Sequence, residues 1–297
     1  IQGDILWHSK KIMLREVLWK DMLNMKINKN FIEIELGKLY AIWLREFKVF
    51  LREKSRIVAS TFTPLLWLFV LGAGFGTIAT NPSAISGTGQ IASGGGPGID
   101  YQKFIFPGIV SMSIIFSSVF FGSYIIWDRK FDFLKSVMVA PVSRTTIFVG
   151  KTFGGMTTSL MQAAILLVVG LFLGIHYTPF SIVLIVVIIL FLSFALTSLG
   201  LAIGSYMESL EGFQLIVSFV VFPLYFLSGA LFPLNNLPPW LSILTALDPA
   251  TYAVDALRNT MVGITGKNPF VLDIGILLGY VIVLGTIGML SFRRMKA

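Results

Sequence analysis

The residues best suited to chemistry in this chain are Gly150-Lys151-Thr152, which match the end of a phosphate-binding loop. Such a loop needs another glycine five positions before Gly150, where Thr145 stands, and a buried strand ahead of it. The two histidines, His8 and His176, are isolated, and there is no cysteine. The sequence therefore excludes P-loop nucleotide binding, thiolate metal sites and a cysteine nucleophile, and it argues against a histidine metal site. We expect no cofactor on this chain.

Long stretches without Asp, Glu, Lys or Arg decide the fold class. The longest runs from Thr152 to Met207, and others lie at 57–99, 104–127, 212–247 and 274–292. The chain is 55% apolar and 13% charged, with a mean hydropathy of +0.83. A charge at the centre of a bilayer costs about 2.5–3.5 kcal/mol, so such stretches are typical of membrane spans. The sequence predicts an all-α polytopic membrane protein.

The windows divide into six predicted spans, because about 20 apolar residues cross the hydrocarbon core. Glycine- and serine-rich residues 77–98 separate the first two, and Gly174–Pro179 breaks the longest window. The expected spans are residues 57–78, 104–127, 147–174, 180–206, 213–232 and 270–292. We expect one transmembrane domain over residues 31–297. Residues 1–30 form an extension of open status, since the chain begins at Ile1 and Met13, Met22 or Met25 could be the true start.

The positive charges lie mainly on one side of these spans. Of the 23 Lys and Arg residues, twenty fall in residues 1–56, 128–151 and the C-terminal tail, and the other three are Lys103, Arg258 and Lys267. The positive-inside rule then places both termini in the cytoplasm. The net charge of +8 is thus a sign of topology, and we expect the bilayer as a partner and no nucleic acid.

Before the first span, apolar residues recur at helical spacing from Leu36 to Leu51, with basic residues on other faces. This pattern predicts an amphipathic elbow helix in the headgroup layer, with a polar side that could face a cytoplasmic partner. The alternative is a basic flank that only orients the first span. The residues that define the elbow helix are Tyr40, Trp43, Arg45, Phe47, Lys48 and Arg52.

The cytoplasmic loop that begins at Asp128 also has helical spacing of its apolar residues, and Pro141 ends the run. Two interpretations remain: a short helix that rests on the membrane, or one that enters a cleft on a soluble motor subunit. For the second, the candidate coupling residues are Asp128, Arg129, Phe131, Phe133, Leu134, Met138, Pro141 and Arg144.

A proline-rich stretch before the last span is too interrupted to cross the membrane, and we expect it to dip in and return as a pair of short helices. Asp248 and Pro249 suit the N-cap and first turn of the second helix. Asp255 and Arg258 can pair on one face of that helix. Trp240 and Tyr252 suit the interfacial layer. The residues of this predicted outer gate are Gly229, Pro233, Pro238, Trp240, Asp248, Pro249, Tyr252, Asp255 and Arg258.

Inside the predicted spans, Gln162 and Gln214 are the most polar groups. They are expected to form hydrogen bonds between helices, and contact with a transported molecule is the alternative. No span interior carries Asp or Glu on this reading, which argues against a carboxylate proton relay.

In these segments the sequence resembles the permease subunits of type-2 ABC exporters, most closely the branch for daunorubicin resistance and nodulation-factor export. The likeness runs from about Phe31 to Phe292, and Asp132 departs from it because relatives usually have Gly there. The matching elements are Phe106-Pro107-Gly108, Trp127-Asp128-Arg129, Ala140-Pro141-Val142-Ser143-Arg144, Gly150-Lys151, the Ser228–Trp240 stretch and Asp248-Pro249 with Tyr252, Leu257 and Arg258.

The resemblance implies six spans, an elbow helix, a coupling helix between spans two and three, and a re-entrant helix pair before span six. It implies a second permease copy and a separate ATPase that binds Mg-ATP, in a prokaryotic cytoplasmic membrane. An amphipathic or lipid-like cargo would leave the cell, and the chain itself would do no covalent chemistry. The alternatives are a channel or ion-coupled carrier that works without an ATPase, and a membrane scaffold or immunity protein.

Overall fold

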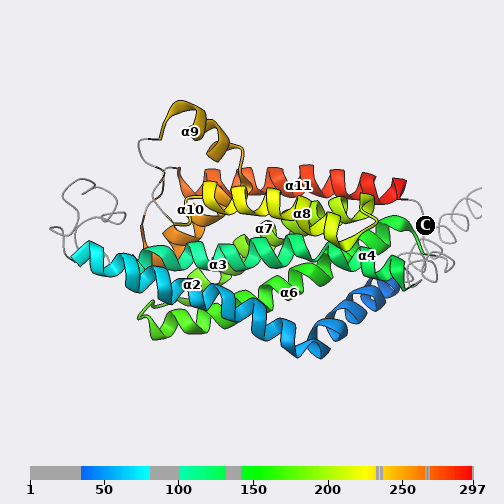
Figure 1. Ribbon diagram of the computed structural model, residues 1–297, viewed down its shortest axis with the longest axis horizontal. Helices are drawn as coiled ribbons and strands as arrows, with labels where there is room; N and C mark the ends of the chain where they lie inside the picture. The colour runs from blue at the N-terminus through cyan, green and yellow to red at the C-terminus, as the bar shows by residue number, and fades with distance from the viewer. Residues whose placement is uncertain are drawn as a thin grey trace, which may run out of the picture.

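The computed structural model describes residues 35–80, 101–131, 142–231, 234, 237–264, 266 and 268–295. Within these ranges it is helical and contains no strand, as expected. Long helices run side by side along one axis (Figure 1). The helices are the elbow helix Glu35–Arg52, α2 (Lys54–Thr80), α3 (Tyr101–Phe120), α4 (Ser123–Lys130), α6 (Arg144–Phe172), α7 (Pro179–Tyr206), α8 (Leu210–Leu227), α9 (Pro239–Ala246), α10 (Pro249–Val262) and α11 (Phe270–Arg294).

Five described helical segments are long and apolar enough to cross a membrane: Tyr101–Lys130, α6, α7, α8 and α11. A sixth is obtained if the elbow helix and Ile57–Gly72, which meet at 69°, form one bent span. The bend agrees with the elbow expected from the sequence, with α2 as the first span. The all-α polytopic prediction is therefore confirmed, and the span bounds differ from those expected by a few residues.

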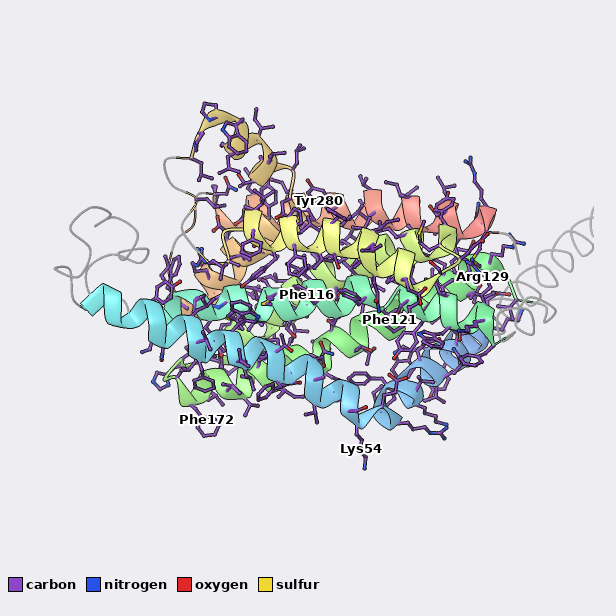
Figure 2. The ribbon with its side chains drawn as sticks, viewed as in Figure 1. Lys54, Phe116, Phe121, Arg129, Phe172 and Tyr280 are labelled. Atoms are coloured by element: carbon purple, nitrogen blue, oxygen red, sulfur yellow. The ribbon has the colours of Figure 1, made fainter. Side chains whose placement is uncertain are left out.

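The start of the elbow helix and the end of α11 lie at the same end of the bundle, which we call the elbow end (Figure 1). Arg129 lies at this end, and Phe172 lies at the opposite, far end (Figure 2). An even number of spans would bring the first and last described helices back to the same end, so the count of six, with the elbow helix and α2 as one bent span, fits this arrangement (Figure 1).

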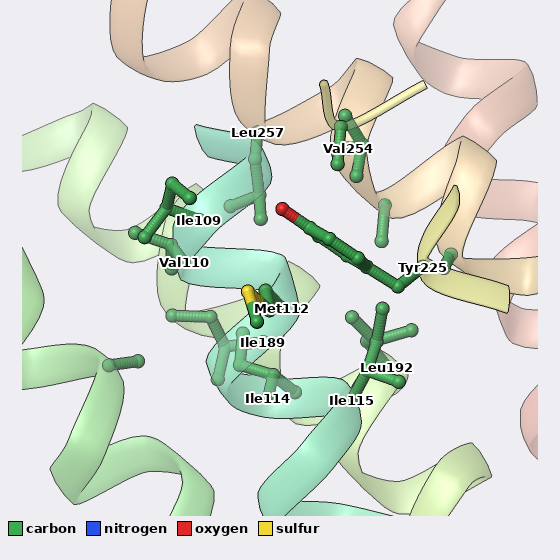
Figure 3. Packing of buried hydrophobic residues seen from close by; sticks show 14 of the residues in the cluster. Ile109, Val110, Met112, Ile114, Ile115, Ile189, Leu192, Tyr225, Val254 and Leu257 are labelled. Atoms are coloured by element: carbon green, nitrogen blue, oxygen red, sulfur yellow. The ribbon is translucent and has the colours of Figure 1, made fainter. Parts of the chain in front are cut away.

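α3 is the central helix of the bundle. Every residue from Phe104 to Ile115 is buried, whereas most apolar residues of α8 and α11 are exposed or only partly buried. Figure 3 shows Tyr225 of α8 among side chains of α3, α7 and α10, including Met112, Leu192 and Leu257. The exposed apolar faces of the outer helices are what a bilayer requires of a membrane protein.

Glycines let α3 and α4 approach α7 closely. A Cβ atom on Gly122, in the short turn between α3 and α4, would collide with the carbonyl oxygen of Gly200. One on Gly200 would collide with the carbonyl oxygen of Val119, and one on Gly204 with that of Gly122. Only residues without a side chain allow this contact of backbone with backbone.

α8 ends five residues before the predicted span does. The hydroxyl of Ser228 turns back to donate to the carbonyl oxygen of Tyr225, and Gly229 follows with φ = 73°. Because this left-handed conformation suits glycine, the helix stops at Leu227. The expected end at residue 232 was therefore wrong.

The re-entrant helix pair is present as α9 and α10 at the far end, and neither is long enough to span a membrane (Figure 1). α10 is enclosed by α3, α7, α8 and α11, whereas α9 stands away from the bundle. As expected, Asp248 is the N-cap of α10, with its Oδ1 accepting from the amide of Ala250 at 2.8 Å, and Pro249 opens the helix.

Candidate functional site

The elbow helix lies against one face of α6 at the elbow end. That face carries small residues at helical spacing, among them Gly150 and Gly154. A Cβ atom on Gly150 would lie 2.9 Å from Ile42 Cγ2, and one on Gly154 would lie 2.6 Å from Glu46 Cβ. Hydrogen bonds hold both ends of the contact: Thr146 donates to Glu35 at 2.6 Å and the Trp43 indole donates to Thr157 at 2.9 Å.

Four charged residues from three helices meet beside this contact: Arg45 and Glu46 of the elbow helix, Asp128 of α4 and Lys151 of α6. Lys151 Nζ pairs with Glu46 Oε1 at 2.9 Å and with Asp128 Oδ2. Arg45 pairs with Asp128 Oδ1 and with Glu46 Oε1, each at 2.7 Å. We call this group the charge cluster. Its two cations and two carboxylates carry no net charge.

The burial of this cluster explains why it must be complete. Lys151 is 1% exposed, and Glu46 and Asp128 are also buried. An isolated buried charge costs several kcal/mol, and only close opposite charges offset that cost. Burial opposes the charge on Arg45, but its hydrogen bond to Asp128 and the charges of Glu46 and Asp128 raise its pKa above the ordinary value.

Asp128 was predicted to be a coupling residue at the start of the loop. Its carboxylate points into the protein, where it accepts from Arg45 and Lys151. Asp128 lies in the last turn of α4, on the face toward α6 and the elbow helix, and not in a loop. Its role in coupling stays a prediction.

Two arginines bracket the segment that links α4 to α6, and both donate to main-chain carbonyl oxygens at helix ends. Arg129 reaches the end of α7, where it donates to Met207 at 3.0 Å and Ser205 at 3.1 Å. Arg144 reaches the end of α11, where it donates to Arg293 at 2.7 Å and Met295 at 2.8 Å. Each satisfies carbonyl groups that a helix leaves without partners.

An apolar rim remains exposed where α4 ends. Phe131 is 72% exposed and stacks on Trp127 with ring centroids 5.6 Å apart, and the Lys130 ammonium lies 5.5 Å from the Trp127 ring. This rim is a surface that a soluble partner could cover. The other predicted coupling residues, Phe133, Leu134, Met138 and Pro141, lie outside the described residues.

The elbow-helix residues have the two faces expected of an amphipathic helix. Lys48 and Arg52 are exposed, as is Tyr40. Trp43 stacks on Phe47 and hydrogen-bonds α6, so it serves the internal contact and not the headgroup layer alone.

At the far end, two tyrosines hold the turn between α9 and α10. Tyr252 donates to the carbonyl oxygen of Ala246 at 2.7 Å, and Tyr280 of α11 donates to that of Leu247 at 2.8 Å. Tyr252 is buried within the protein, and its predicted place at the depth of the interfacial layer stays a prediction. Trp240 on α9 is 64% exposed and suits that layer. Pro238 is the N-cap of α9, and Pro233 lies outside the described residues.

Buried Arg258 ties α10 to the segment that follows α8. Its Nη2 donates to the carbonyl oxygen of Gly229 at 2.8 Å, and its guanidinium lies 4.1 Å from the Phe104 ring centroid. The predicted pair with Asp255 is present but loose, at 3.9 Å. Asp248 Oδ2 is buried without a hydrogen-bond partner, and burial raises the pKa of this carboxyl to about 8.

Of the two glutamines, Gln162 forms the expected hydrogen bond between helices, since its Nε2 donates to Ser60 of α2 at 2.8 Å. Gln214 is exposed on α8. Sequence reasoning missed Lys151 and Asp273, which are buried charged residues within α6 and α11. Asp273 lies in the first turn of α11, where it accepts from Asn268 at 3.2 Å, so it stands at the end of the predicted span and not in its interior.

Comparison with known proteins decides the family. The model of the ABC-2 type transporter family matches residues 37–262, which is most of the chain. The chain belongs to the ABC-2 type transporter family. The match begins in the elbow helix and ends with α10, so it contains the charge cluster, both arginine caps and the re-entrant pair.

Relatives of this ABC-2 permease carry transport names. It is 28% identical to the inner membrane transport permease YadH of Escherichia coli K12, over 82% of this chain and 90% of YadH. It is 28% identical to the putative transport permease ycf38 of Cyanophora paradoxa, over 75% of this chain and 73% of ycf38. It is 26% identical to nodulation protein J of Rhizobium leguminosarum bv. viciae, over 86% of this chain and 93% of that protein. The resemblance found from motifs is thus confirmed, and the protein is a membrane transport permease.

Proposed function

We propose that this permease is the transmembrane subunit of an ATP-driven exporter, and that a separate ATPase supplies the energy. Membership of the ABC-2 family is the observation that carries the proposal. The chain itself offers no complete P-loop, because Thr145 replaces the first glycine of that motif. The permease thus needs a partner to use ATP, and its own role is to bind and pass the cargo.

The ATPase would dock at the elbow end, on the rim of Trp127 and Phe131 and the segment that follows it. Three features support this location. The rim is apolar and exposed. Arg129 and Arg144, on the helices that flank the loop, cap the ends of α7 and α11, so a force on the loop reaches α7 and α11 as well as α4 and α6. The elbow helix adds the exposed cations Lys48 and Arg52 nearby.

The elbow end would face the cytoplasm, with both termini there, and α9 and α10 would form a gate at the outer face. Positive-inside supports this orientation, since Lys103 and Arg258 are the basic residues of the far end among those described. A second permease copy, identical or related, would complete a pathway for a hydrophobic, amphipathic or lipid-linked molecule. The membrane would be a prokaryotic cytoplasmic membrane, as YadH is named for the inner membrane.

Co-purification tests the proposal. The tagged permease is expressed with ATPase subunits that carry complete P-loops, and the complex is reconstituted into vesicles. We expect a stable complex with two permease copies, ATP hydrolysis only when the ATPase is present, and stimulation by lipid-like cargo. A permease that hydrolyses ATP alone, or that transports without any ATPase, would overturn the proposal and favour a carrier or channel.

Engineered cysteines test the orientation, because the natural chain has none. Lys130 and His176 are exposed at opposite ends of the bundle. In intact cells, an impermeant thiol reagent should label His176→Cys and spare Lys130→Cys until the membrane is opened. The reverse pattern would place the elbow end outside.

A further inference from the structure

We propose that Asp128 is a positioning residue that makes the elbow helix follow the loop-bearing end of α4. This inference rests on the proposed function, because it assigns a path by which a motion at the docking rim reaches the first span.

Asp128 connects the docking rim to the charge cluster. Phe131, which is exposed at the docking rim, follows Asp128 by less than one helical turn, and the carboxylate of Asp128 is buried in the charge cluster. The elbow helix continues into α2 through a 69° bend. Asp128 thus lies between the surface where a partner would push and the helix that leads into the first span.

The elbow helix contacts α6 and α4 in two different ways. The elbow helix is bound to α6 by small-residue packing along Gly150 and Gly154 and by hydrogen bonds at both ends. Its contact with α4 instead runs through charged groups: Arg45 to both oxygens of Asp128, and Lys151 as a bridge from Asp128 to Glu46. Tyr124 of α4 also donates to Glu53 at 2.8 Å. Close packing resists displacement, so α6 and the elbow helix form one unit, and Asp128 joins α4 to that unit.

The contact between α4 and the elbow helix through the charge cluster, which we call the joint, is neutral and largely buried. The two carboxylates and Lys151 are buried and Arg45 is partly exposed, so water competes for these ion pairs less than it does at a protein surface. Moving α4 away from the elbow helix would leave Asp128 buried without its two cationic partners, and Arg45 and Lys151 would then share only Glu46. That penalty holds the two helices together while the ATPase changes shape.

Two double variants separate this role from plain structural support. Asp128→Leu with Lys151→Met removes one charge of each sign and leaves Arg45 paired with Glu46 on the elbow helix. Glu46→Leu with Lys151→Met also removes one of each sign but leaves Arg45 paired with Asp128, which keeps the link to α4. Neither leaves an unpaired buried charge, and replacing a buried ion pair by apolar groups of similar volume is often neutral for stability. The Tyr124–Glu53 bond is common to both.

Distances between spin labels show directly whether α4 stays in place against the elbow helix. One pair is Lys48→Cys with Lys130→Cys, which joins the elbow helix to the end of α4. The reference pair is Lys48→Cys with Phe153→Cys, which joins it to α6. When the charge cluster is intact, the distance between the labels at positions 48 and 130 should be the same in the resting and the ATP-vanadate-trapped complex. The Asp128→Leu/Lys151→Met variant should broaden or shift that distance, whereas the Glu46→Leu/Lys151→Met variant and the reference pair should not change.

The functional readout is cargo exported per ATP hydrolysed by the reconstituted complex. Loss of the joint should reduce this ratio by about tenfold or more in the Asp128→Leu/Lys151→Met variant while ATPase binding persists. The inference would be overturned if the two double variants showed the same label distances and the same export ratio. It would also be overturned if the distance between positions 48 and 130 changed while the charge cluster was intact. If no ATPase binds, the proposed function fails, but the labels on the isolated permease still show whether Asp128 holds α4 to the elbow helix.

Discussion

Arg129 and Arg144 flank the same segment between α4 and α6, yet they cap different helices: Arg129 donates to carbonyl oxygens at the end of α7, and Arg144 to those at the end of α11. The two ends of the segment are thereby fixed to helices that are distant from it in sequence. Each bond joins a charged donor to a carbonyl group that would otherwise lack a partner.

We expect Arg129→Met to reduce the free energy of unfolding by about 1–2 kcal/mol, because it removes hydrogen bonds from a charged donor to main-chain carbonyls. Arg129→Lys should restore only part of this, since an ammonium group lacks the fork that reaches Met207 and Ser205 together. Thermal unfolding of the purified permease in detergent measures the difference. Lys48→Met, at an exposed site on the elbow helix, is the control and should change little. Equal effects of Arg129→Met and Lys48→Met would contradict the capping role.

Removing Lys151 alone should be far more damaging than removing it together with a carboxylate. Lys151→Met leaves two buried carboxylates with Arg45 alone and should cost about 3–5 kcal/mol. Adding Glu46→Leu removes the excess negative charge and should recover much of that loss, so the two substitutions are not additive. Thermal unfolding of the single and double variants gives the coupling energy. Lys38→Met breaks only the surface pair with Glu35 and serves as the control. Additive costs would show that Glu46 and Lys151 act independently.

Because α7 lies in close contact with α3 and α4, replacing glycine by alanine should have opposite effects on stability at Gly200, within this contact, and at Gly279, outside it. Gly200→Ala places a methyl group against the carbonyl oxygen of Val119 and should cost about 1–3 kcal/mol or prevent assembly. Gly279→Ala on α11 meets nothing within 4 Å and should stabilise the helix by about 0.5–1 kcal/mol. Yield and thermal stability in detergent distinguish them. A tolerated Gly200→Ala would mean that α3 and α7 are less closely packed than they are here.

The buried carboxyl group of Asp248, at the far end, should make the free energy of unfolding depend on pH. The pKa of its carboxyl is about 8 in the folded protein, against an ordinary value of 3.8, because the group is buried. Between these values the folded state binds a proton that the unfolded state has released, so stability falls as pH rises from about 4 to about 8. Asp248→Asn keeps an oxygen for the amide of Ala250 and removes the titration, so its melting temperature should fall less between pH 5 and pH 9. The neighbouring ionisable groups are the same in both proteins: Tyr252 and Tyr280 lie close enough to interact with Asp248, and Asp273 with Tyr252. The same pH dependence in both proteins would assign it to another group.

The spans could be predicted from the sequence because a bilayer excludes charge, and this requirement acts on each stretch separately. The elbow helix and the N-cap at Asp248 were also found, since both are local patterns. The charge cluster was not, because Glu46, Asp128 and Lys151 are brought together only by tertiary packing. One signal was present: Glu46 lies on the same helical stripe as Leu39, Ile42 and Phe50, where a carboxylate needs a buried partner.

The burial of Tyr252 and the end of α8 could not be predicted from the sequence for the same reason. A tyrosine on a short helix near the membrane surface is typical of the interfacial layer, and only the fold shows that α10 is enclosed by four helices. The end of α8 depends on Gly229, whose φ of 73° cannot be inferred from a sequence in which apolar residues continue to Phe232.

The backbone contact between Val119, Gly122, Gly200 and Gly204 limits how this protein can move. Side chains can change rotamer to let helices slide, but two backbones in contact have no such freedom. α3 with α4 and α7 should then behave as a fixed frame throughout a transport cycle. The pathway for cargo would open by displacement of the more exposed helices α2 and α8 against this frame, so inhibitors that wedge between α3 and those helices should arrest the cycle, whereas the frame itself offers them no entry.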